Sequence, residues 1–272
     1  MSAVSPRLRR KLLDQRSVAR WVGREFVYKL RTGSTMDDAR ALARDGAAGG
    51  AVVFAEEQTA GRGTRGRSWV SPAGQNLYFT IVLRPSVAQI QRLSLITPVA
   101  IANAVEQTLG LYPRIKWPND LQLGGKKFAG ILIEGEWTGD RPAFALVGVG
   151  VNVNFEPMAH AQLDRPATSL AIEKGRPLAR EPLLAAIFAS FERAFEGAEH
   201  RALFRGWRSR QALLGRPVTL SGSAAIREPG GVIEGTAEDV AEDGALLVRL
   251  PGGDLRRFQA GEVSLRGDGG RA

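Results

Sequence analysis

The sequence predicts an α+β fold, in which helices cover a mixed, mostly antiparallel sheet and a small β-barrel of about 50 residues follows. Three observations predict it. Strand-like and helix-like segments do not alternate strictly, as they would in a doubly wound parallel sheet. The strand-like runs 51–57 and 76–83 are joined by a loop, and 127–136 and 142–153 by a short turn. After Leu213, short runs are separated by glycine, proline and aspartate turns.

The first elements are strands and a capped helix. Ser34 or Thr35 is expected to cap a helix that runs through Leu42 and stops at a glycine of the segment 46–50. β-branched and aromatic side chains predict strands around this helix at 25–30, 51–55 and 76–83.

Apolar periodicity places the remaining elements. The spacing over 91–109 is helical, and Pro98 is expected to kink that helix. Two amphipathic helices are predicted at 180–196 and 201–208. Further strands are predicted at 115–117, 128–134, 143–153, 217–220, 232–236, 245–250 and 255–258.

Most of the net charge of +9 lies near the start of the chain. Residues 1–24 carry seven lysine and arginine side chains against Asp14 alone. A solvated extension, a nucleic-acid-binding arm and an arginine-rich transit peptide all fit this composition. We therefore divide the 272 residues into a basic extension (1–24), a large domain (25–212) and a C-terminal barrel (213–268).

Composition excludes several chemistries. The chain has no cysteine, which removes thiol nucleophiles, disulfides and cysteine-bound metals. His160 and His200 are its two histidines, and they form no metal-binding spacing or catalytic triad pattern. No apolar run is long enough to span a membrane, and no secretory signal is recognisable. We expect a cytoplasmic protein without membrane contact.

The segment 61–69 is the most informative one. Its glycines match G-x-G-x-x-G, but a dinucleotide site needs a helix directly after the motif. The residues Ser71 to Gly74 break the chain instead and lead into a strand. No Walker A sequence is present. A solvated basic loop and an anion-binding loop remain as interpretations.

Arginines favour the anion-binding interpretation. Arg62, Arg65 and Arg67 alternate with glycines, which let the backbone approach a ligand closely. Guanidinium groups and backbone N–H groups together suit phosphate or carboxylate oxygens. Trp69 is available to stack on a base or to cover the site.

Three further segments carry candidate residues. Asn119 and Asp120 follow a short strand, where such a pair is either a simple turn or a ligand contact. Lys127 enters an apolar strand and is expected to point into a cleft. Gly148 and Gly150 leave one strand face bare, which makes room for a flat ligand or for close helix packing.

Taken in order, these motifs resemble the biotin protein ligase family. The resemblance runs from about residue 26 to 266. It rests on Ser34-Thr35, the runs 58–63, 65–69 and 76–78, and the runs 116–120, 127–134, 148–152 and 261–266. It implies a catalytic domain like that of class II aminoacyl-tRNA synthetases, followed by an SH3-like barrel.

The resemblance also implies an activity. Biotin and ATP would give biotinyl-5′-AMP and pyrophosphate, and the biotinyl group would pass to one lysine of a biotin carboxyl carrier protein or domain of a biotin-dependent carboxylase. Mg²⁺ is implied as well, with Asp120 as the carboxylate near which it would bind. A homodimer through edge-strand pairing is compatible with the resemblance. Attack of a carboxylate on phosphorus needs no protein nucleophile, which agrees with the missing cysteine.

Site residues follow from the resemblance position by position. Catalytic roles would fall on Lys127, Arg62, Arg65 and Arg67. Biotin would contact Ser34, Thr35, Gln58, Gly61, Arg62, Gly63, Lys127, Gly130 and Gly148. The nucleotide would contact Arg65, Arg67, Trp69, Asn119, Asp120 and Asn152, with Glu262 and Arg266 reaching it from the barrel.

Two rival functions stay open. A lipoate or octanoate ligase shares the related fold, but hydroxyls at Ser34 and Thr35 and the amide of Gln58 favour the polar ureido ring of biotin. A non-catalytic nucleic-acid-binding protein would explain the charge but not Lys127 or the glycine strand. Family members that double as repressors carry an N-terminal winged helix-turn-helix, which residues 1–24 are too short to form, so no specific nucleic-acid partner is expected.

Thr64 departs from the family pattern, in which many members carry a basic residue at this place. With one cation fewer, we expect either a weaker hold on the adenylate or compensation by residues elsewhere. Labelling of bystander lysines in the presence of biotin and ATP measures escape of the adenylate. Tight retention, with labelling confined to the carrier lysine, would contradict the weaker hold.

Overall fold

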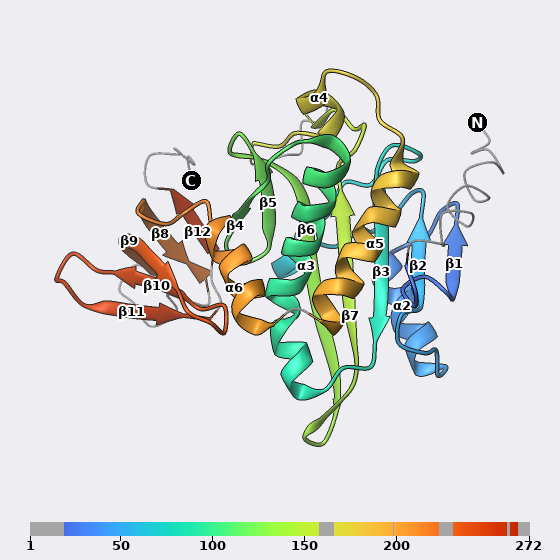
Figure 1. Ribbon diagram of the computed structural model, residues 1–272, viewed down its shortest axis with the longest axis horizontal. Helices are drawn as coiled ribbons and strands as arrows, with labels where there is room; N and C mark the ends of the chain where they lie inside the picture. The colour runs from blue at the N-terminus through green and yellow to red at the C-terminus, as the bar shows by residue number, and fades with distance from the viewer. Residues whose placement is uncertain (1–18, 158–165, 198, 223–230, 260–261, 266–272) are drawn as a thin grey trace.

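Two β-sheets organise the part of the chain that the computed structural model describes, residues 19–157, 166–197, 199–222, 231–259 and 262–265. Figure 1 shows a large sheet with helices packed across it and a smaller sheet beside its β4 edge. The large sheet has seven strands in the order β1-β2-β3-β7-β6-β5-β4, and the small one has five in the order β11-β10-β9-β8-β12. The predicted α+β class is therefore confirmed.

The large sheet is mostly antiparallel, as predicted. Only β1 and β2 pair in parallel among its described strands. Its strands are β1 (Phe26–Lys29), β2 (Val52–Ala55), β3 (Leu77–Leu83), β4 (Arg114–Lys116), β5 (Asp120–Leu123), β6 (Lys126–Thr138) and β7 (Arg141–Val151). The prediction missed β5, which is four residues long and lies between two turns.

The helices begin at side-chain caps in several places. The helix α2 (Thr35–Arg44) is capped by Ser34, whose hydroxyl accepts from the Met36 N–H. The helix α3 (Val87–Leu109) starts earlier than predicted, because Ser86 and Gln89 form a reciprocal capping box. It is uninterrupted at Pro98. The others are η2 (Thr64–Gly66), α4 (Leu170–Lys174), α5 (Arg180–Glu196) and α6 (His200–Ser209).

Alternation along the strands divides the core between the two faces of the large sheet. Val52 and Phe54 belong to a cluster that α3 and α5 complete on one face. Val53 belongs to a second cluster that α2 completes on the other face. Helices therefore cover both faces, and the face that carries α2 also carries the candidate site described below.

A buried ion pair anchors the start of the long loop between β2 and β3. Arg180 Nη1 lies 2.8 Å from Glu56 Oε2, and the two side chains are 7% and 0% exposed. Glu56 also accepts from the Tyr28 hydroxyl, and Arg180 donates to the Asn76 carbonyl. Burial raises the pKa of Tyr78, beside this network, well above its usual range, so that phenol stays protonated.

The C-terminal sheet contains β8 (Pro217–Ser221), β9 (Val232–Val240), β10 (Leu246–Arg249), β11 (Leu255–Phe258) and β12 (Glu262–Leu265). No pairing between β11 and β12 closes a barrel among the described strands, so the structure describes an antiparallel sheet. Trp117 Nε1, from the turn between β4 and β5, donates to the Gly244 carbonyl at 2.8 Å. That bond ties the small sheet to the large one.

None of the helices in the described ranges has the length and apolar character needed to cross a membrane.

Removing one partner of the buried pair should destabilise the fold. In Arg180→Met, Glu56 keeps its burial but loses its counter-charge, and we expect the free energy of unfolding to fall by about 3–5 kcal/mol at neutral pH. Urea denaturation measures this loss. The double variant Glu56→Gln with Arg180→Met should recover much of it. A single variant as stable as the parent would contradict the expectation.

Candidate functional site

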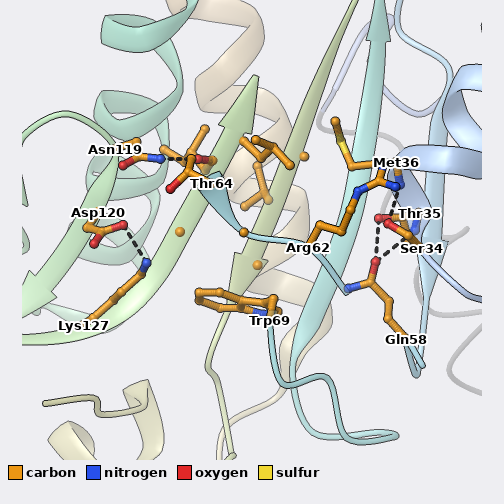
Figure 2. Close-up of a pocket in the computed structure, with 17 residues that line it drawn as sticks. Ser34, Thr35, Met36, Gln58, Arg62, Thr64, Trp69, Asn119, Asp120 and Lys127 are labelled. Atoms are coloured by element: carbon orange, nitrogen blue, oxygen red, sulfur yellow. Dashed lines mark hydrogen bonds and ion pairs between the residues drawn. The ribbon is translucent and has the colours of Figure 1, made fainter. Parts of the chain in front are cut away.

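A pocket of about 460 Å³ opens on the α2 face of the large sheet. Figure 2 shows Ser34, Thr35, Gln58 and Arg62 gathered on one side of it, with Asn119, Asp120 and Lys127 on the other. It is lined by these residues and by Met36, Gly63, Thr64, Trp69, Gly130, Ile131, Leu132, Gly148, Val149 and Gly150.

Strand register sets the floor of this pocket. Gly150 pairs with Gly130, which pairs with Asp120, so these three residues lie on one face of neighbouring strands. A Cβ atom on Gly150 would lie 2.5 Å from the Trp69 ring, and one on Gly130 would lie 2.9 Å from it. The indole of Trp69 therefore lies directly on two paired glycines.

The sequence left two interpretations of the glycine strand, room for a flat ligand and close packing, and the structure shows close packing at glycines that also line the pocket. Trp69 occupies the space over Gly150, and the Met36 sulfur would be 2.6 Å from a Cβ on Gly148. The second contact is the close helix packing that the sequence left as its alternative. Glycine is needed at both positions, because the side chain of another residue occupies the space that a side chain on Gly148 or Gly150 would fill.

Hydroxyls and an amide form the end of the pocket near α2. Gln58 Oε1 accepts from the Thr35 backbone N–H at 2.9 Å and from the Thr35 hydroxyl at 3.1 Å. Thr80 donates to the Thr35 hydroxyl, and Gln58 Nε2 donates to Ser71. These bonds fix the rotamers of Thr35 and Gln58, so the polar end is rigid before any ligand arrives.

The arginine-rich segment folds into a short hairpin over the pocket, which we call the flap (residues 61–69). The Trp69 N–H donates to the Gly61 carbonyl, and the Gly63 N–H donates to the Arg67 carbonyl. A Cβ on Gly61 would lie 2.6 Å from the Trp69 carbonyl oxygen, so only glycine fits there. Arg65, at the tip, has a positive φ of 60°.

A lysine and an aspartate form the opposite end of the pocket. Lys127 Nζ lies 2.6 Å from Asp120 Oδ1, and the two side chains are 29% and 19% exposed. The same ammonium lies 5.2 Å from the centre of the Trp69 ring. Asn119 donates to the Ile131 carbonyl at 2.7 Å, which holds the β4–β5 turn against β6.

A second cavity, of about 730 Å³, adjoins the first. The two share Gly63, Thr64, Trp69, Asp120 and Lys127. Arg67, Asn152, Phe155 and Pro166 are among the residues that line the second cavity alone. Asn152 donates from its amide to the Thr168 carbonyl at 3.1 Å. Trp69 and Lys127 therefore stand at the junction of two cavities, one ending in hydroxyls and the other bordered by an arginine and an amide.

Comparison with known proteins gives this geometry a context. Residues 31–152 match the Biotin/lipoate A/B protein ligase family, and residues 213–266 match the Biotin protein ligase C terminal domain. The chain is 38% identical to the Biotin--[acetyl-CoA-carboxylase] ligase of Paracoccus denitrificans over 82% of its own length and 93% of that protein. The chain belongs to the biotin protein ligase family.

Other members place this chain within the family. The ligase of Mycobacterium tuberculosis is 32% identical over 93% of this chain and 94% of its own length. By contrast, the chain spans about half, 54%, of the Bifunctional ligase/repressor BirA of Bacillus subtilis. The solved biotin protein ligase of Aquifex aeolicus, in complex with biotin and ATP, has a TM-score of 0.72 at 26% identity and covers 89% of this chain and 99% of that one.

The structure brings most of the predicted site residues together in the two cavities, but not all of them. Arg65 lines neither cavity, and its guanidinium lies within 3.4 Å of where a Cβ on Gly222 would be, beside the end of β8. The backbone of Glu262 pairs with Ser221 in the same region. The Glu262 side chain and Arg266 lie outside what the structure describes.

Sequence reasoning missed several residues that shape the pocket. Met36 fills the space over Gly148, Thr80 and Ser71 hold Thr35 and Gln58, and Asp37 pairs with Arg62. The predicted helix start at Ser34 already placed Met36 and Asp37 in the first turn beside the site. The long-range contacts of Thr80 and Ser71 had no local signal.

A methyl group on Gly150 should displace Trp69. In Gly150→Ala the new Cβ would overlap the indole, so Trp69 must leave the glycine pair. We expect a red shift of tryptophan emission that is absent when the same change is made in a Trp69→Phe background. Gly252→Ala is the control, because nothing lies within 4 Å of its added Cβ. An unchanged spectrum in Gly150→Ala would contradict the placement of Trp69.

Proposed function

We propose that this chain activates biotin with ATP to biotinyl-5′-AMP and transfers the biotinyl group to a lysine of a carrier protein. One observation carries the proposal: two cavities of different chemistry meet at a single ammonium group, Lys127 Nζ, beside Trp69. Two substrates bound in these cavities would bring their reacting ends together there, which is the main requirement of a condensation between them.

Biotin fits the cavity that ends in hydroxyls. Its ureido ring carries N–H donors and a carbonyl acceptor, and the buried side chains of Ser34 and Thr35 are 2% and 3% exposed. Ser34 Oγ accepts from Met36 N–H and so keeps its own proton for the ureido carbonyl. Gln58 has a fixed orientation beside them. An apolar dithiolane in the same place would offer no acceptor to the Ser34 hydroxyl proton, which disfavours lipoate.

The backbone of the flap and of β6 and β7 completes the biotin cavity. Gly130 and Gly148 let neighbouring side chains approach closely, and Gly61, which lines neither cavity, lets the two strands of the flap approach each other. Arg62 lies over it from the flap. The valeryl chain of biotin would then run from the hydroxyl end toward Lys127.

The nucleotide fits the second cavity. Asn152 uses its amide nitrogen on the Thr168 carbonyl, so its carbonyl oxygen is oriented to accept from an exocyclic amino group. Trp69 offers an aromatic face for adenine, and Arg67 a guanidinium for phosphate. Arg65 would approach the phosphates from the flap tip, where Glu262 and Arg266 of the C-terminal region would also reach.

The chemistry follows from the meeting point. A biotin carboxylate oxygen attacks the α-phosphorus of ATP, a new P–O bond forms, and the bond to the β-phosphate oxygen breaks to release pyrophosphate. Negative charge grows on the α-phosphate oxygens in the transition state, where the Lys127 ammonium and the flap arginines stabilise it. The lysine amine of the carrier then attacks the acyl carbon, an amide forms, and AMP leaves.

Asp120 sets the position of the lysine. Its pairing with Lys127 holds the ammonium at the junction in the ligand-free protein. Arrival of the biotin carboxylate and the α-phosphate gives Lys127 new anionic partners, and Asp120 keeps it from leaving the junction. Asn119 supports this by tying the turn that carries Asp120 to β6.

We propose that magnesium binds as its complex with ATP and not at a preformed protein site. No cluster of three or more metal-binding side chains was found in the residues the structure describes. Phosphate oxygens would supply most ligands, with Asp120 as the nearby carboxylate, and the ion would neutralise charge on the phosphates.

The acceptor is proposed to be the biotin carboxyl carrier protein or domain of a biotin-dependent carboxylase, in the cytoplasm. The domain division at 25–212 and 213–268 and a homodimer through edge-strand pairing also remain proposals.

Biotin-dependent exchange of pyrophosphate into ATP tests the first half-reaction, with lipoate and octanoate in parallel. Exchange with biotin alone supports the proposal, and exchange with lipoate but not biotin would overturn it.

Replacing the junction lysine should slow adenylation without unfolding the protein. In Lys127→Ala the half-buried ammonium is lost, and we expect the exchange rate to fall about 10²- to 10³-fold, the scale of one transition-state contact. Lys126→Ala, which removes the neighbouring exposed lysine, is the matched control and should keep its rate. An active Lys127→Ala, or one that no longer folds, would show that Lys127 does not have this role.

A further inference from the structure

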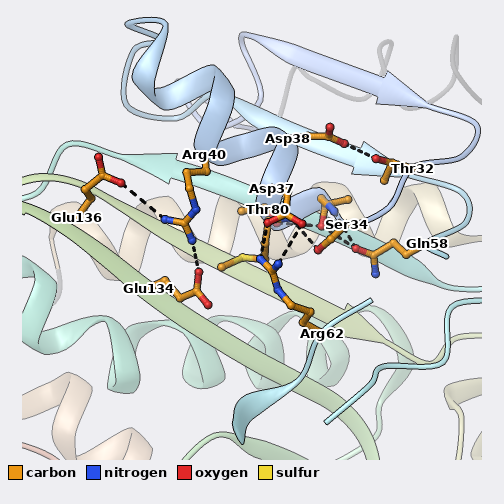
Figure 3. Close-up of polar contacts among 12 residues, drawn as sticks. Thr32, Ser34, Asp37, Asp38, Arg40, Gln58, Arg62, Thr80, Glu134 and Glu136 are labelled. Carbon is orange, nitrogen blue, oxygen red and sulfur yellow. Dashed lines mark hydrogen bonds and ion pairs between the residues drawn. The ribbon is translucent and has the colours of Figure 1, made fainter. Parts of the chain in front are cut away.

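An ion pair joins the flap to the first turn of α2. Arg62 Nη2 lies 2.7 Å from Asp37 Oδ1, and Arg62 Nη1 donates to Asp37 Oδ2 at 3.0 Å. The pair is thus bidentate, the arrangement that fixes the guanidinium plane as well as its position. Figure 3 shows Arg62 reaching from the flap strand across to this carboxylate.

Asp37 lines neither cavity, whereas its partner Arg62 lines the first one. It sits one turn from Ser34 and Thr35, on the same helix end. That helix end therefore supplies hydroxyls to the pocket and, through Asp37, a carboxylate to the flap that covers it. The hydroxyl end and the cover of the biotin cavity are therefore joined through a single helical turn.

The neighbouring carboxylate has a different task. Asp38 accepts from Lys29 Nζ at 2.7 Å and from the Thr32 hydroxyl at 2.6 Å. Figure 3 shows Asp38 directed toward Thr32 and away from Arg62. Asp37 and Asp38 both lie in the first turn and interact alike with the helix dipole. They differ in their partners and in exposure, at 58% for Asp37 and 23% for Asp38, and Asp38 serves as the comparison for a charge in the same helical turn.

We propose that Asp37 is a positioning residue that holds the flap closed over the biotin cavity by pairing with Arg62 before substrate binds. The inference rests on the proposed function for the identity of the ligand, but the closure itself is a property of the free chain. A flap closed in advance needs less ordering when biotin binds and opens less often once it is bound.

The strength of the Arg62–Asp37 pair determines how far the equilibrium between the open and the closed flap is shifted. The Arg62 and Asp37 side chains are 38% and 58% exposed, so water and salt screen their attraction. An exposed pair of this kind changes an equilibrium by about two- to fivefold. The flap is thus biased toward closure and can still open for exchange of substrate and product.

Biotin dissociation is the first test. In Asp37→Asn we expect the dissociation rate of biotin to rise about two- to fivefold at low salt, with the KM for ATP and kcat unchanged. Raising the salt concentration should reduce the difference in biotin dissociation rate between this variant and the parent. Asp37→Glu should restore slow release, and Asp38→Asn should leave it unchanged. Equal effects from Asp37→Asn and Asp38→Asn would overturn the proposal, because helix stability would then explain both.

Limited proteolysis tests the closure without using any activity. Trypsin cleavage after Arg65 and Arg67, followed by mass spectrometry in the ligand-free protein, should be about two- to fivefold faster in Asp37→Asn and unchanged in Asp38→Asn. In an Arg62→Ala background, Asp37→Asn should not increase the cleavage rate any further. Faster cleavage without any biotin binding would support the closure and refute the proposed function. Unchanged cleavage in Asp37→Asn would refute the closure itself.

Discussion

The rest of the site depends on one packing contact, that of the Trp69 indole with the paired glycines Gly130 and Gly150. That contact is possible because neither glycine has a side chain and because strand register places them next to each other on one face. It fixes the C-terminal end of the flap on the sheet. It also puts an aromatic face 5.2 Å from the Lys127 ammonium, where cation–π attraction and the Asp120 carboxylate hold that charge. A single side chain therefore separates two cavities and borders the group at which they meet.

The opposite end of the flap is held by different physics. Gly61 is fixed by close approach to the Trp69 carbonyl, and Arg62 by the charge of Asp37. Packing is insensitive to salt and ionic attraction is not, so the two ends of the hairpin respond differently to conditions and to ligand. The flap is thus held at one end by a packed aromatic ring and at the other by a weaker, exposed ion pair. Such a flap suits a reaction with a labile mixed anhydride. In the proposed reaction it would exclude water during adenylation and open again for the carrier lysine.

Much of this arrangement could be predicted from the sequence, because it depends on local signals. Ser34 as a helix cap, the strands on both sides of the flap and a cleft position for Lys127 follow from residue type and spacing, whereas the role of Lys127 is implied only by the family resemblance. Contacts between distant segments could not be predicted. Nothing near Gly148 indicates that Met36 fills its vacant side-chain position, and nothing near Arg62 indicates Asp37 as its partner. The nearness of Arg65, at the flap tip, to Gly222 of the C-terminal region is another such contact, and its predicted contact with the nucleotide stays a prediction.

The central claim is that the acid group of biotin and the α-phosphate meet at Lys127. A crystal structure with biotin and an ATP analogue whose α,β-bridging oxygen is replaced by methylene tests it most directly, since the analogue binds but cannot release pyrophosphate. The account predicts a carboxylate oxygen and an α-phosphate oxygen both within about 3.5 Å of Lys127 Nζ, on the two sides of Trp69. Both ligands clearly bound, with Lys127 paired only to Asp120 and more than about 6 Å from either reacting group, would contradict it.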